Sequence, residues 1–444
     1  MIKQVTSVAL LFIAGFLQAQ EEKSSFSLYE AQSYALEHAE AVKNAQLDIE
    51  AANQKVVETR AIGLPQVNME AGFQNFLNLP VQVVDGAFIG QPGTTVSFRA
   101  GTEYNASAGL SVNQLIFDGS YIVGLQVSRL YKDFSVAAAE VSEEEVLYNV
   151  TNAYQMALIA QKNLGFVDSL VDATQKLFDQ QKNYYELGMM QKEDLDQLEF
   201  SLLNAKTSFE NAQNQMKTSM DLLKMTMAFP LDQNIELTDD LSVLVNQSFA
   251  LSADLGSIEN NLNLQMLERQ KTLNEYNVKN MKAANLPSFG AFFNQQYNAY
   301  TNEFDLFASD QPYYGQTVWG LKLTIPVFSS GSRSAKTKQA IIEVKKAENE
   351  IDQLKRQLEF QEMKLRNDFY NAKRMLELQE KNVQLAKSIY ENALAKKEIG
   401  EGNSIIVSQK YSQLINAQTQ YVSALVNVLN ARLEIDKLYH KIVK

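Results

Sequence analysis

The chain has 444 residues, a formal net charge of −12 and no cysteine. Glycine (19) and proline (7) are scarce, which excludes a turn-rich all-β protein and a disordered linker and favours long helices. The lack of cysteine excludes disulfides, thiolate metal sites and a lipid-bearing N-terminal cysteine, and the acidic balance argues against binding to nucleic acid.

The N-terminal segment has the pattern of a secretory signal peptide. Lys3 precedes an apolar stretch over residues 5–17, and cleavage is expected after Ala19, although Leu17 stands where a small residue is usual. The prediction is a signal peptide at residues 1–19, and a cytosolic N-terminal helix is the alternative. After residue 19 the sequence contains no run of ~18 apolar residues, so it predicts no helix that spans a membrane.

Three short motifs each occur twice, in the same order. They are Leu64-Pro65 and Leu286-Pro287, Ile116-Phe117 and Val327-Phe328, and Leu187-Gly188 and Ile399-Gly400. The separation between the two copies is far longer than the ~20–50 residues of a solenoid unit. We therefore predict a tandem duplication, with a first structural repeat at residues 20–245 and a second at residues 246–444.

Each repeat is expected to begin with a helix. Ser27 and Glu30 have the spacing of a capping box, and the helix that follows is predicted to run to about Ile62, before Pro65. Its counterpart in the second repeat is predicted over residues 252–285.

Between the proline and phenylalanine motifs the apolar residues alternate with polar ones, which is the period of a β-strand. Val67, Met69, Ala71 and Phe73 show this alternation in the first repeat. It predicts one β-hairpin at about 66–117 and another at about 288–328. Strands of ~9–11 residues with one apolar and one polar face have the length of a transmembrane β-strand. A soluble hairpin packed on a helix is the alternative.

Several residues mark the ends of these strands. The helix–strand junctions are expected at Pro65, Phe117, Pro287 and Phe328. Aromatic side chains, among them Phe73, Tyr297 and Trp319, would suit the belt at a membrane interface. The segments 77–105 and 299–316 are expected to be outward-facing loops.

A long glycine-poor stretch follows each phenylalanine motif, and ~67 helical residues would extend about 100 Å. The chain is then expected to turn, near 187–194 and near 399–406, and to run back. A heptad pattern begins after the first turn with Leu195, Leu202 and Phe209. It predicts coiled-coil helical hairpins, with an ordinary bundle core as the alternative.

This order of elements, repeated twice, resembles the TolC-like outer-membrane efflux proteins, also called outer membrane factors. The resemblance implies a mainly helical fold with β-strands: a long antiparallel coiled-coil α-helical barrel, plus four strands per chain in a trimeric twelve-stranded outer-membrane β-barrel. It further implies a homotrimer embedded in outer-membrane lipid and extending into the periplasm. The implied function is the passive exit duct of a tripartite efflux or secretion system, served by a periplasmic adaptor (membrane fusion protein) and an inner-membrane transporter.

The resemblance also implies two kinds of site. The adaptor would dock on the tips of the helical hairpins, at Leu187, Gly188, Ile399, Gly400 and Gly402. An acidic periplasmic gate would be formed by Glu193, Asp194 and Asp196, with Asp194 as the candidate for a cation-binding constriction. A solvated acid at a helix start, favoured by the helix dipole, is the alternative. The second repeat departs from the family pattern, since it has Ile406 and Gln409 at the corresponding positions.

No motif for chemical catalysis is present in the sequence. It lacks a phosphate-binding loop, a His-Glu-x-x-His motif and a Gly-x-Ser-x-Gly motif, so we expect no enzyme activity, no cofactor and no metal site. Two alternatives to a small-molecule efflux duct are a type I protein-secretion exit and a periplasmic coiled-coil scaffold.

Overall fold

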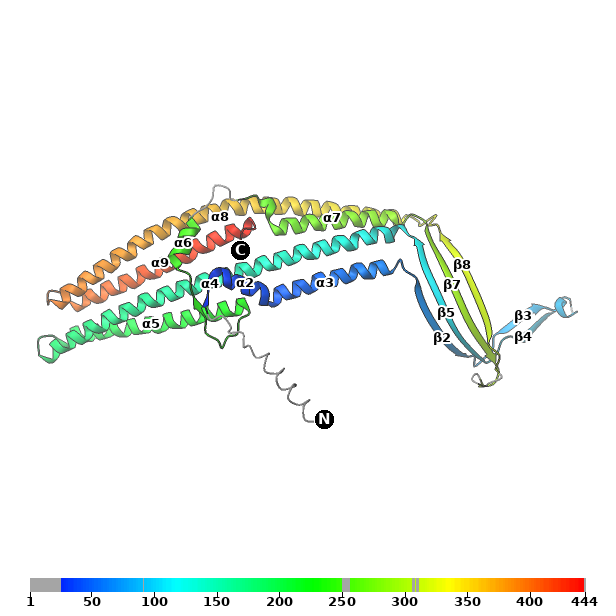
Figure 1. Cartoon of the computed structure of the whole chain (residues 1–444), viewed down its shortest axis with the longest axis horizontal. Helices are drawn as coiled ribbons and strands as arrows, with labels where there is room; N and C mark the ends of the chain where they lie inside the picture. Colours follow the sequence, from blue (N-terminus) through cyan, green and yellow to red (C-terminus); the bar gives the residue numbers. More distant parts are fainter. Residues whose placement is uncertain (1–24, 91, 250–255, 306–307, 309–310, 443–444) are drawn as a thin grey trace, which may run out of the picture. The chain divides into compact units, whose positions relative to one another are not determined.

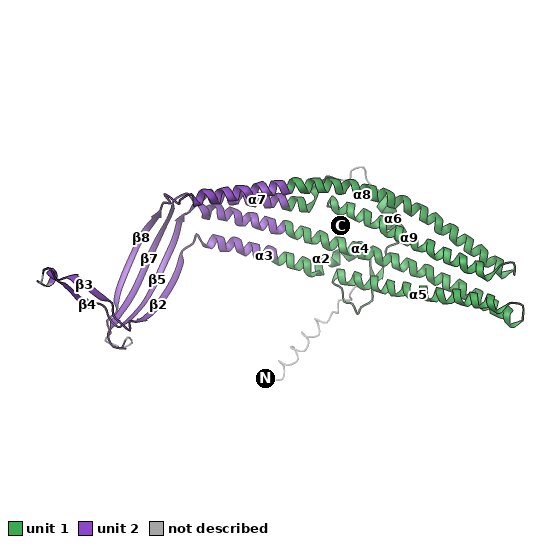
Figure 2. Ribbon diagram, turned by 180° about the vertical axis from the view of Figure 1, so that it is seen from behind, with its two compact units in different colours: residues 1–47, 137–266, 351–444 green, residues 48–136, 267–350 purple. Residues whose placement is uncertain are grey.

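The computed structural model describes residues 25–90, 92–249, 256–305, 308 and 311–442. The expected signal peptide and the expected start of the second repeat's first helix lie outside the described residues. The chain divides into two compact units (Figure 2), and each unit contains segments of both predicted repeats. Unit 1 comprises residues 1–47, 137–266 and 351–444, and unit 2 comprises residues 48–136 and 267–350.

Unit 2 contains a four-stranded antiparallel sheet (Figure 1). Its strands, in spatial order, are β2 (Gln66–Asn75), β5 (Tyr104–Phe117), β7 (Ser288–Thr301) and β8 (Tyr314–Thr324). The two predicted hairpins are therefore both present, and β5 pairs with β7 to join them into one sheet. Strands β2 and β8 form the two edges of this sheet.

The two faces of the sheet differ in polarity. Residues opposite each other in neighbouring strands lie on the same face, and one such row consists of Val67, Val112, Phe293 and Trp319. The row next to it, on the opposite face, consists of Asn68, Ser111, Asn294 and Val318. The sheet thus has one apolar and one mainly polar face, and neither face packs a core, since both sides of the edge strands are exposed.

A third hairpin lies within the segment that the sequence analysis treats as a loop. Strands β3 (Val81–Asp85) and β4 (Thr95–Arg99) pair, with the 3₁₀-helix η1 (Gly86–Ile89) between them. The pairing of β2 with β5 continues one step toward this hairpin: the Phe76 amide, just after β2, donates to the Glu103 carbonyl, just before β5, at 2.8 Å. These strands have only five residues each, too few for the alternation to stand out from the surrounding turn residues.

Four helices flank the strands in the sequence. They are α3 (Glu40–Ala61), α4 (Gly119–Glu186), α7 (Leu262–Ala283) and α8 (Ser332–Glu398). At the first junction, the Gln114 amide donates to the Gly63 carbonyl at 2.7 Å and the Tyr121 hydroxyl donates to the Arg60 carbonyl at 3.2 Å. These hydrogen bonds fix the chain where helix gives way to strand.

The helix predicted from Ser27 to about Ile62 is divided in the structure, which corrects that prediction. The capping box is confirmed, and it opens the short helix α2 (Leu28–His38). The chain then becomes extended at Ala39 (φ −61°, ψ 131°) before α3 begins. Alanine is the best helix former, so local propensity does not indicate this break; Ala39 is buried, and tertiary packing decides its conformation.

Unit 1 consists mainly of helices that pack side by side. It contains the larger parts of α4 and α8 together with α5 (Lys192–Met227), α6 (Leu241–Phe249) and α9 (Ser404–Leu438). It also contains the 3₁₀-helix η2 (Ile258–Asn260) and a two-stranded parallel sheet of β1 (Ser25–Phe26) and β6 (Glu236–Leu237). No helix in the described part of the chain is long and apolar enough to cross a membrane.

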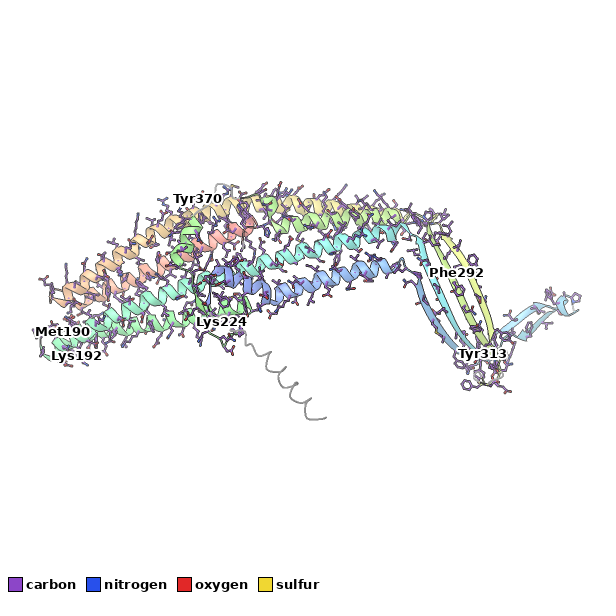
Figure 3. All side chains as sticks on the ribbon, viewed as in Figure 1. Met190, Lys192, Lys224, Phe292, Tyr313 and Tyr370 are labelled. Carbon is purple, nitrogen blue, oxygen red and sulfur yellow. The ribbon has the colours of Figure 1, made fainter. Side chains whose placement is uncertain are left out.

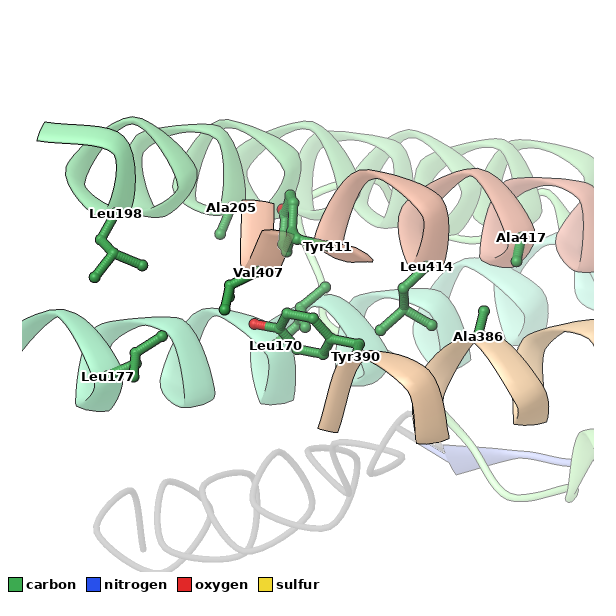
Figure 4. Packing of buried hydrophobic residues seen from close by; sticks show 10 residues of the cluster. All are labelled: Leu170, Leu177, Leu198, Ala205, Ala386, Tyr390, Val407, Tyr411, Leu414 and Ala417. Carbon is green, nitrogen blue, oxygen red and sulfur yellow. The ribbon is translucent and has the colours of Figure 1, made fainter. Parts of the chain in front are cut away.

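The hydrophobic core near the helical turns draws on both repeats. Helices α4, α5, α8 and α9 all contribute side chains to one buried cluster (Figure 4). Its members are Leu170, Leu177, Leu198, Ala205, Ala386, Tyr390, Val407, Tyr411, Leu414 and Ala417. The cluster combines large side chains with three alanines, Ala205, Ala386 and Ala417, and small residues at a helix seam allow the helices to approach closely.

Candidate functional site

The two helical turns have the same backbone geometry. Helix α4 ends at Glu186 and α5 begins at Lys192, whereas α8 ends at Glu398 and α9 begins at Ser404. The second residue of each turn is a glycine of positive φ, +73° at Gly188 and +82° at Gly400. At each glycine, two amide donors bond back to the last helical turn, the pattern of a Schellman cap.

Gly402 has a different role in the second turn. A Cβ atom at this position would lie 2.7 Å from the Lys397 amide nitrogen and 2.8 Å from the Lys397 Cα. The next residue, Asn403, caps α9 by accepting a hydrogen bond from the Ile405 amide at 2.7 Å. The tight turn between α8 and α9 therefore requires a residue without a Cβ atom at position 402.

We expect Gly402→Ala to distort the α8–α9 turn, because the new methyl group would overlap backbone atoms that cannot move away without shifting the helix end. The expected result is a locally opened turn, measured as faster limited proteolysis between Glu398 and Ser404. Gly165→Ala is the matched control: its Cβ would meet nothing within 4 Å, and alanine in place of a helical glycine stabilises by roughly 0.5–1 kcal/mol. Equal rates of cleavage in this segment for both variants would contradict the prediction.

Both turns expose apolar side chains. Leu187 is 73% exposed, Met189 is 73% exposed and Ile399 is 71% exposed. Met190 and Lys192 lie at the same end of the α4–α5 hairpin (Figure 3). Exposed apolar groups of this size at a helical turn favour a surface that contacts another protein.

The three acidic residues of the predicted gate lie at the start of α5. Glu193 and Asp194 belong to its first turn, where the helix dipole favours negative charge. Asp194 is partly buried, while Glu193 and Asp196 are exposed. Among the residues that the structure describes, no group of three or more acidic or histidine side chains is placed to hold a metal ion.

Lys397 is the residue of this region that the sequence analysis missed. Its Nζ atom lies 4.0 Å from Asp194 Oδ1, and its side chain is only 8% exposed. It lies in the last turn of α8, so this contact joins the first repeat's turn to the second repeat's helix. The available signal was a pair of lysines just before Gly400, at a helix end where basic residues are favoured.

Two further hydrogen bonds connect the hairpins. Gln197 Nε2 on α5 donates to Ser408 Oγ on α9 at 2.9 Å, and the hydroxyls of Thr174 on α4 and Tyr390 on α8 lie 3.2 Å apart. Burial raises the pKa of Tyr390 above that of an exposed tyrosine, so its hydroxyl stays protonated. Ile406, the counterpart of an acidic position in the first repeat, is half exposed and adds no charge.

The structure places the remaining predicted residues on the sheet and its ends. Pro65 and Pro287 immediately precede β2 and β7, and Phe117 is the last residue of β5. Phe328 lies between β8 and α8 and is almost fully exposed.

The predicted interface aromatics Phe73, Tyr297 and Trp319 are all more than half exposed. Each belongs to the apolar face of the sheet, as the register shows. Trp319 lies in the middle of β8, away from the strand ends where an interface belt is expected. Phe73 and Tyr297 lie toward the end of the sheet from which the β3–β4 hairpin leaves.

An exposed four-stranded sheet with one apolar face, joined in sequence to pairs of very long helices, is the architecture of an outer-membrane channel protein. The family described as "Outer membrane efflux protein" matches residues 32–226 and 257–439. The chain belongs to this family. It is a channel protein of the outer membrane rather than an enzyme, and it serves as an exit duct that extends into the periplasm.

Comparisons with individual proteins agree with this assignment. The chain is 22% identical over 402 residues to the outer membrane protein TolC of Vibrio cholerae, covering 88% of this chain and 86% of TolC. It is 23% identical over 219 residues to the proteases secretion protein PrtF of Dickeya chrysanthemi, covering 48% of this chain and 46% of PrtF. The crystal structure of CusC superimposes with a TM-score of 0.71 at 15% identity, covering 92% of this chain and 91% of CusC.

Proposed function

We propose that three copies of this chain close into one barrel and form a continuous duct for export. The observation that supports this is the sheet itself, which has four strands and two free edges, β2 and β8. Four strands cannot close a barrel, since the smallest closed ones have about eight. Pairing β8 of one copy with β2 of the next would satisfy both edges and leave no unpaired backbone in the lipid.

The polarity of the two faces sets the direction in which the sheet would curl. The face with Val67, Val112 and Phe293 would point to lipid, and the face with Asn68, Ser111 and Asn294 would line the water-filled lumen. A polar lumen lets hydrated cargo pass without a binding step.

Engineered disulfides can test the proposed barrel, because the natural chain has no cysteine. One cysteine replaces Glu70 on the polar face of β2, and a second is moved stepwise along β8. At the correct register we expect covalent dimers and trimers on a non-reducing gel. The control pair Ser111→Cys and Asn294→Cys lies directly opposite within one chain and should give only a cross-linked monomer. Monomer at every β8 position would overturn the proposal.

We further propose that the two turns, at Leu187-Gly188 and at Ile399-Gly400-Gly402, dock a periplasmic adaptor that connects the duct to an inner-membrane transporter. The support is their matching cap geometry and their exposed apolar side chains. Two similar turns per chain would give a trimer six similar contact points. The duct itself supplies no energy in this scheme.

The proposed gate consists of Asp194 with Lys397. In the trimer, Glu193 and Asp194 would recur three times around the axis and attract cations, while Lys397 would hold Asp194 against α8. An exposed ion pair contributes ~0–1 kcal/mol, but a lysine that is 8% exposed is costly to leave without a partner. The ion pair would therefore shift the equilibrium between closed and open tips toward the closed state without preventing opening.

We expect Lys397→Gln to raise the open probability of the purified trimer in planar bilayers, because Asp194 loses its contact with α8. Asp194→Asn should act in the same way and should also weaken block by divalent cations. The double variant should add little to either single change, since both remove one interaction. Lys396→Gln is the control on the neighbouring exposed lysine. Unchanged conductance and unchanged cation block in Asp194→Asn would contradict the gate.

A type I protein-secretion exit is the second candidate for the cargo class. The relative PrtF is named as a protease secretion protein, whereas the overall fold is shared with CusC. A deletion strain separates the two candidates: sensitivity to toxic small molecules supports efflux, and loss of particular proteins from the culture medium supports secretion.

A further inference from the structure

A cavity of about 510 Å³ opens on the apolar face of the sheet, near the end from which the β3–β4 hairpin leaves. Its floor is formed by three alanines, Ala71 on β2 and Ala106 and Ala108 on β5. Its walls are the rings of Phe73, Tyr297, Phe304 and Tyr313. We call this cavity the rim slot. Tyr313 marks its place at the end of the sheet (Figure 3).

The walls of the rim slot are held in place by specific contacts. The ring of Phe304 packs edge-on against Phe73 and Tyr104, with ring centres 6.0 and 5.6 Å apart. Thr301, the last residue of β7, accepts a hydrogen bond from the Glu303 amide at 3.1 Å, which fixes the chain that leads to Phe304. On the other side, the Tyr297 ring lies over Gly315, where a Cβ would come within 3.0 Å of it.

The lining of the rim slot selects an apolar occupant. Alanines and aromatic rings make up most of its lining, which Gly72 and Ser107 complete. Water would therefore find few hydrogen-bond partners inside. The volume is many times the ~30 Å³ share of a single water molecule. An occupant that fills it must be an extended hydrocarbon or a ring system.

The position of the rim slot on the sheet indicates where that occupant comes from. Ala108 and Tyr297 share the apolar face with Val112, Phe293 and Trp319, the face that meets lipid. Ala108 lies nine residues from the junction residue Phe117, about 30 Å along the strand at ~3.3 Å per residue. With a strand tilt of ~40° this corresponds to ~23 Å of height, close to the outer limit of a ~25 Å apolar band.

A second copy of the chain does not suit this cavity. A neighbouring strand would add to the free edge of β2 in the plane of the sheet, ~4.8 Å to its side. β5 is an inner strand with β2 and β7 on either side, and its alanines form part of the floor on the face of the sheet. A strand added at the edge would therefore leave the rim slot open.

We propose that the rim slot binds one acyl chain of an outer-leaflet lipid. This inference rests on the proposed membrane insertion of the sheet but goes beyond it, since ordinary lipid contact needs no cavity. The alanine floor provides the depth, and the four rings enclose the chain from the sides. Either a phospholipid or a lipopolysaccharide could supply the acyl chain.

The test uses the full-length trimer in nanodiscs of phosphatidylethanolamine and phosphatidylglycerol that contain a phospholipid with a diazirine in its acyl chain. After illumination, peptides are mapped by mass spectrometry. We expect strong labelling of the segment around Phe304 and Tyr313, and a several-fold loss in Ala106→Phe, which fills the floor. Ala291→Phe is the control, because Ala291 lies on the same face outside the rim slot.

Tyr313→Ala gives a second test, because it removes a wall without crowding the floor, and it should also reduce labelling. Equal labelling of all variants would overturn the proposal and leave ordinary boundary lipid. Dissociation of the trimer by Ala106→Phe with unchanged labelling by Tyr313→Ala would also overturn it, in favour of a neighbouring copy in the cavity. Absence of labelling on the Val112 and Trp319 peptides would instead refute membrane insertion. Repeating the labelling in competition with added lipopolysaccharide distinguishes the two lipid sources.

Discussion

Val112→Arg is expected to reduce sharply the amount of trimer in the outer membrane. Val112 lies on the apolar face of β5 between Val67 and Phe293. It is about midway between the row of Phe117 and the row of Tyr297, and so near the middle of the proposed apolar band. An arginine on the lipid face at mid-depth costs ~2–4 kcal/mol, and the trimer would contain three such changes. The measurement is the amount of heat-resistant trimer in outer-membrane fractions.

The matched control for Val112→Arg is Asn113→Arg on the next residue of the same strand. Asn113 belongs to the polar face, so its arginine would extend into the lumen and should leave the amount of trimer almost unchanged. The two positions are neighbours in one strand, so a difference between the two variants reports which face of the sheet the arginine is on. Equal loss in both variants would contradict the assignment of the two faces.

Tyr154→Ala is expected to destabilise unit 1 by about 3–5 kcal/mol, the range for removing a large buried aromatic side chain. Tyr154 is fully buried on α4, and its hydroxyl donates to the Phe26 carbonyl at 2.9 Å. The Asp239 amide donates to the same hydroxyl at 3.4 Å. This side chain therefore joins the N-terminal β1 segment and the β6 segment to the helices.

Conservative variants separate packing from hydrogen bonding at this position. Tyr154→Phe should cost only about 0.5–1.5 kcal/mol, since the Phe26 carbonyl still accepts from the Thr238 amide at 3.1 Å. The exposed Tyr29 provides the control, and Tyr29→Ala should change stability by less than ~0.5 kcal/mol. Thermal unfolding of the detergent-solubilised protein measures the stability of all three variants. A Tyr154→Ala effect as small as that of Tyr29→Ala would contradict the role of this side chain.

Tyr154 should also make the stability of unit 1 depend on pH. Burial raises the pKa of Tyr154 above its ordinary value, ahead of the contribution from Asp239. The folded state thus holds the proton more tightly than the unfolded state. Its contribution to stability should be fully present below about pH 10, the ordinary tyrosine pKa, and should decline as the pH rises above it.

Much of the fold was predictable because its signals are local. The capping box at Ser27 and Glu30 is visible in four residues, and the alternation around Val67 and Trp319 reveals strands before any partner is known. Gly188 and Gly400 end two long glycine-poor stretches and adopt the positive φ of helix caps. The repetition of these signals in one order made the family resemblance specific.

The features that the sequence analysis missed depend on contacts between distant segments. The break at Ala39 is determined by burial rather than by helix propensity. The approach of Lys397 to Asp194 joins residues about 200 positions apart, and the lysine pair before Gly400 does not indicate which acidic residue it approaches. The rim slot likewise requires β2, β5, β7 and the segment around Phe304 to come together.

The central claim, a duct made of several copies with their sheets in the outer membrane, is tested most directly by the mass of the native particle. The protein would be extracted with detergent from purified outer membranes and measured by size-exclusion chromatography with light scattering. For a chain of 49.9 kDa, three copies predict a protein mass of about 150 kDa after subtraction of detergent. A particle of single-chain mass, or a protein found in the soluble periplasmic fraction, would contradict it.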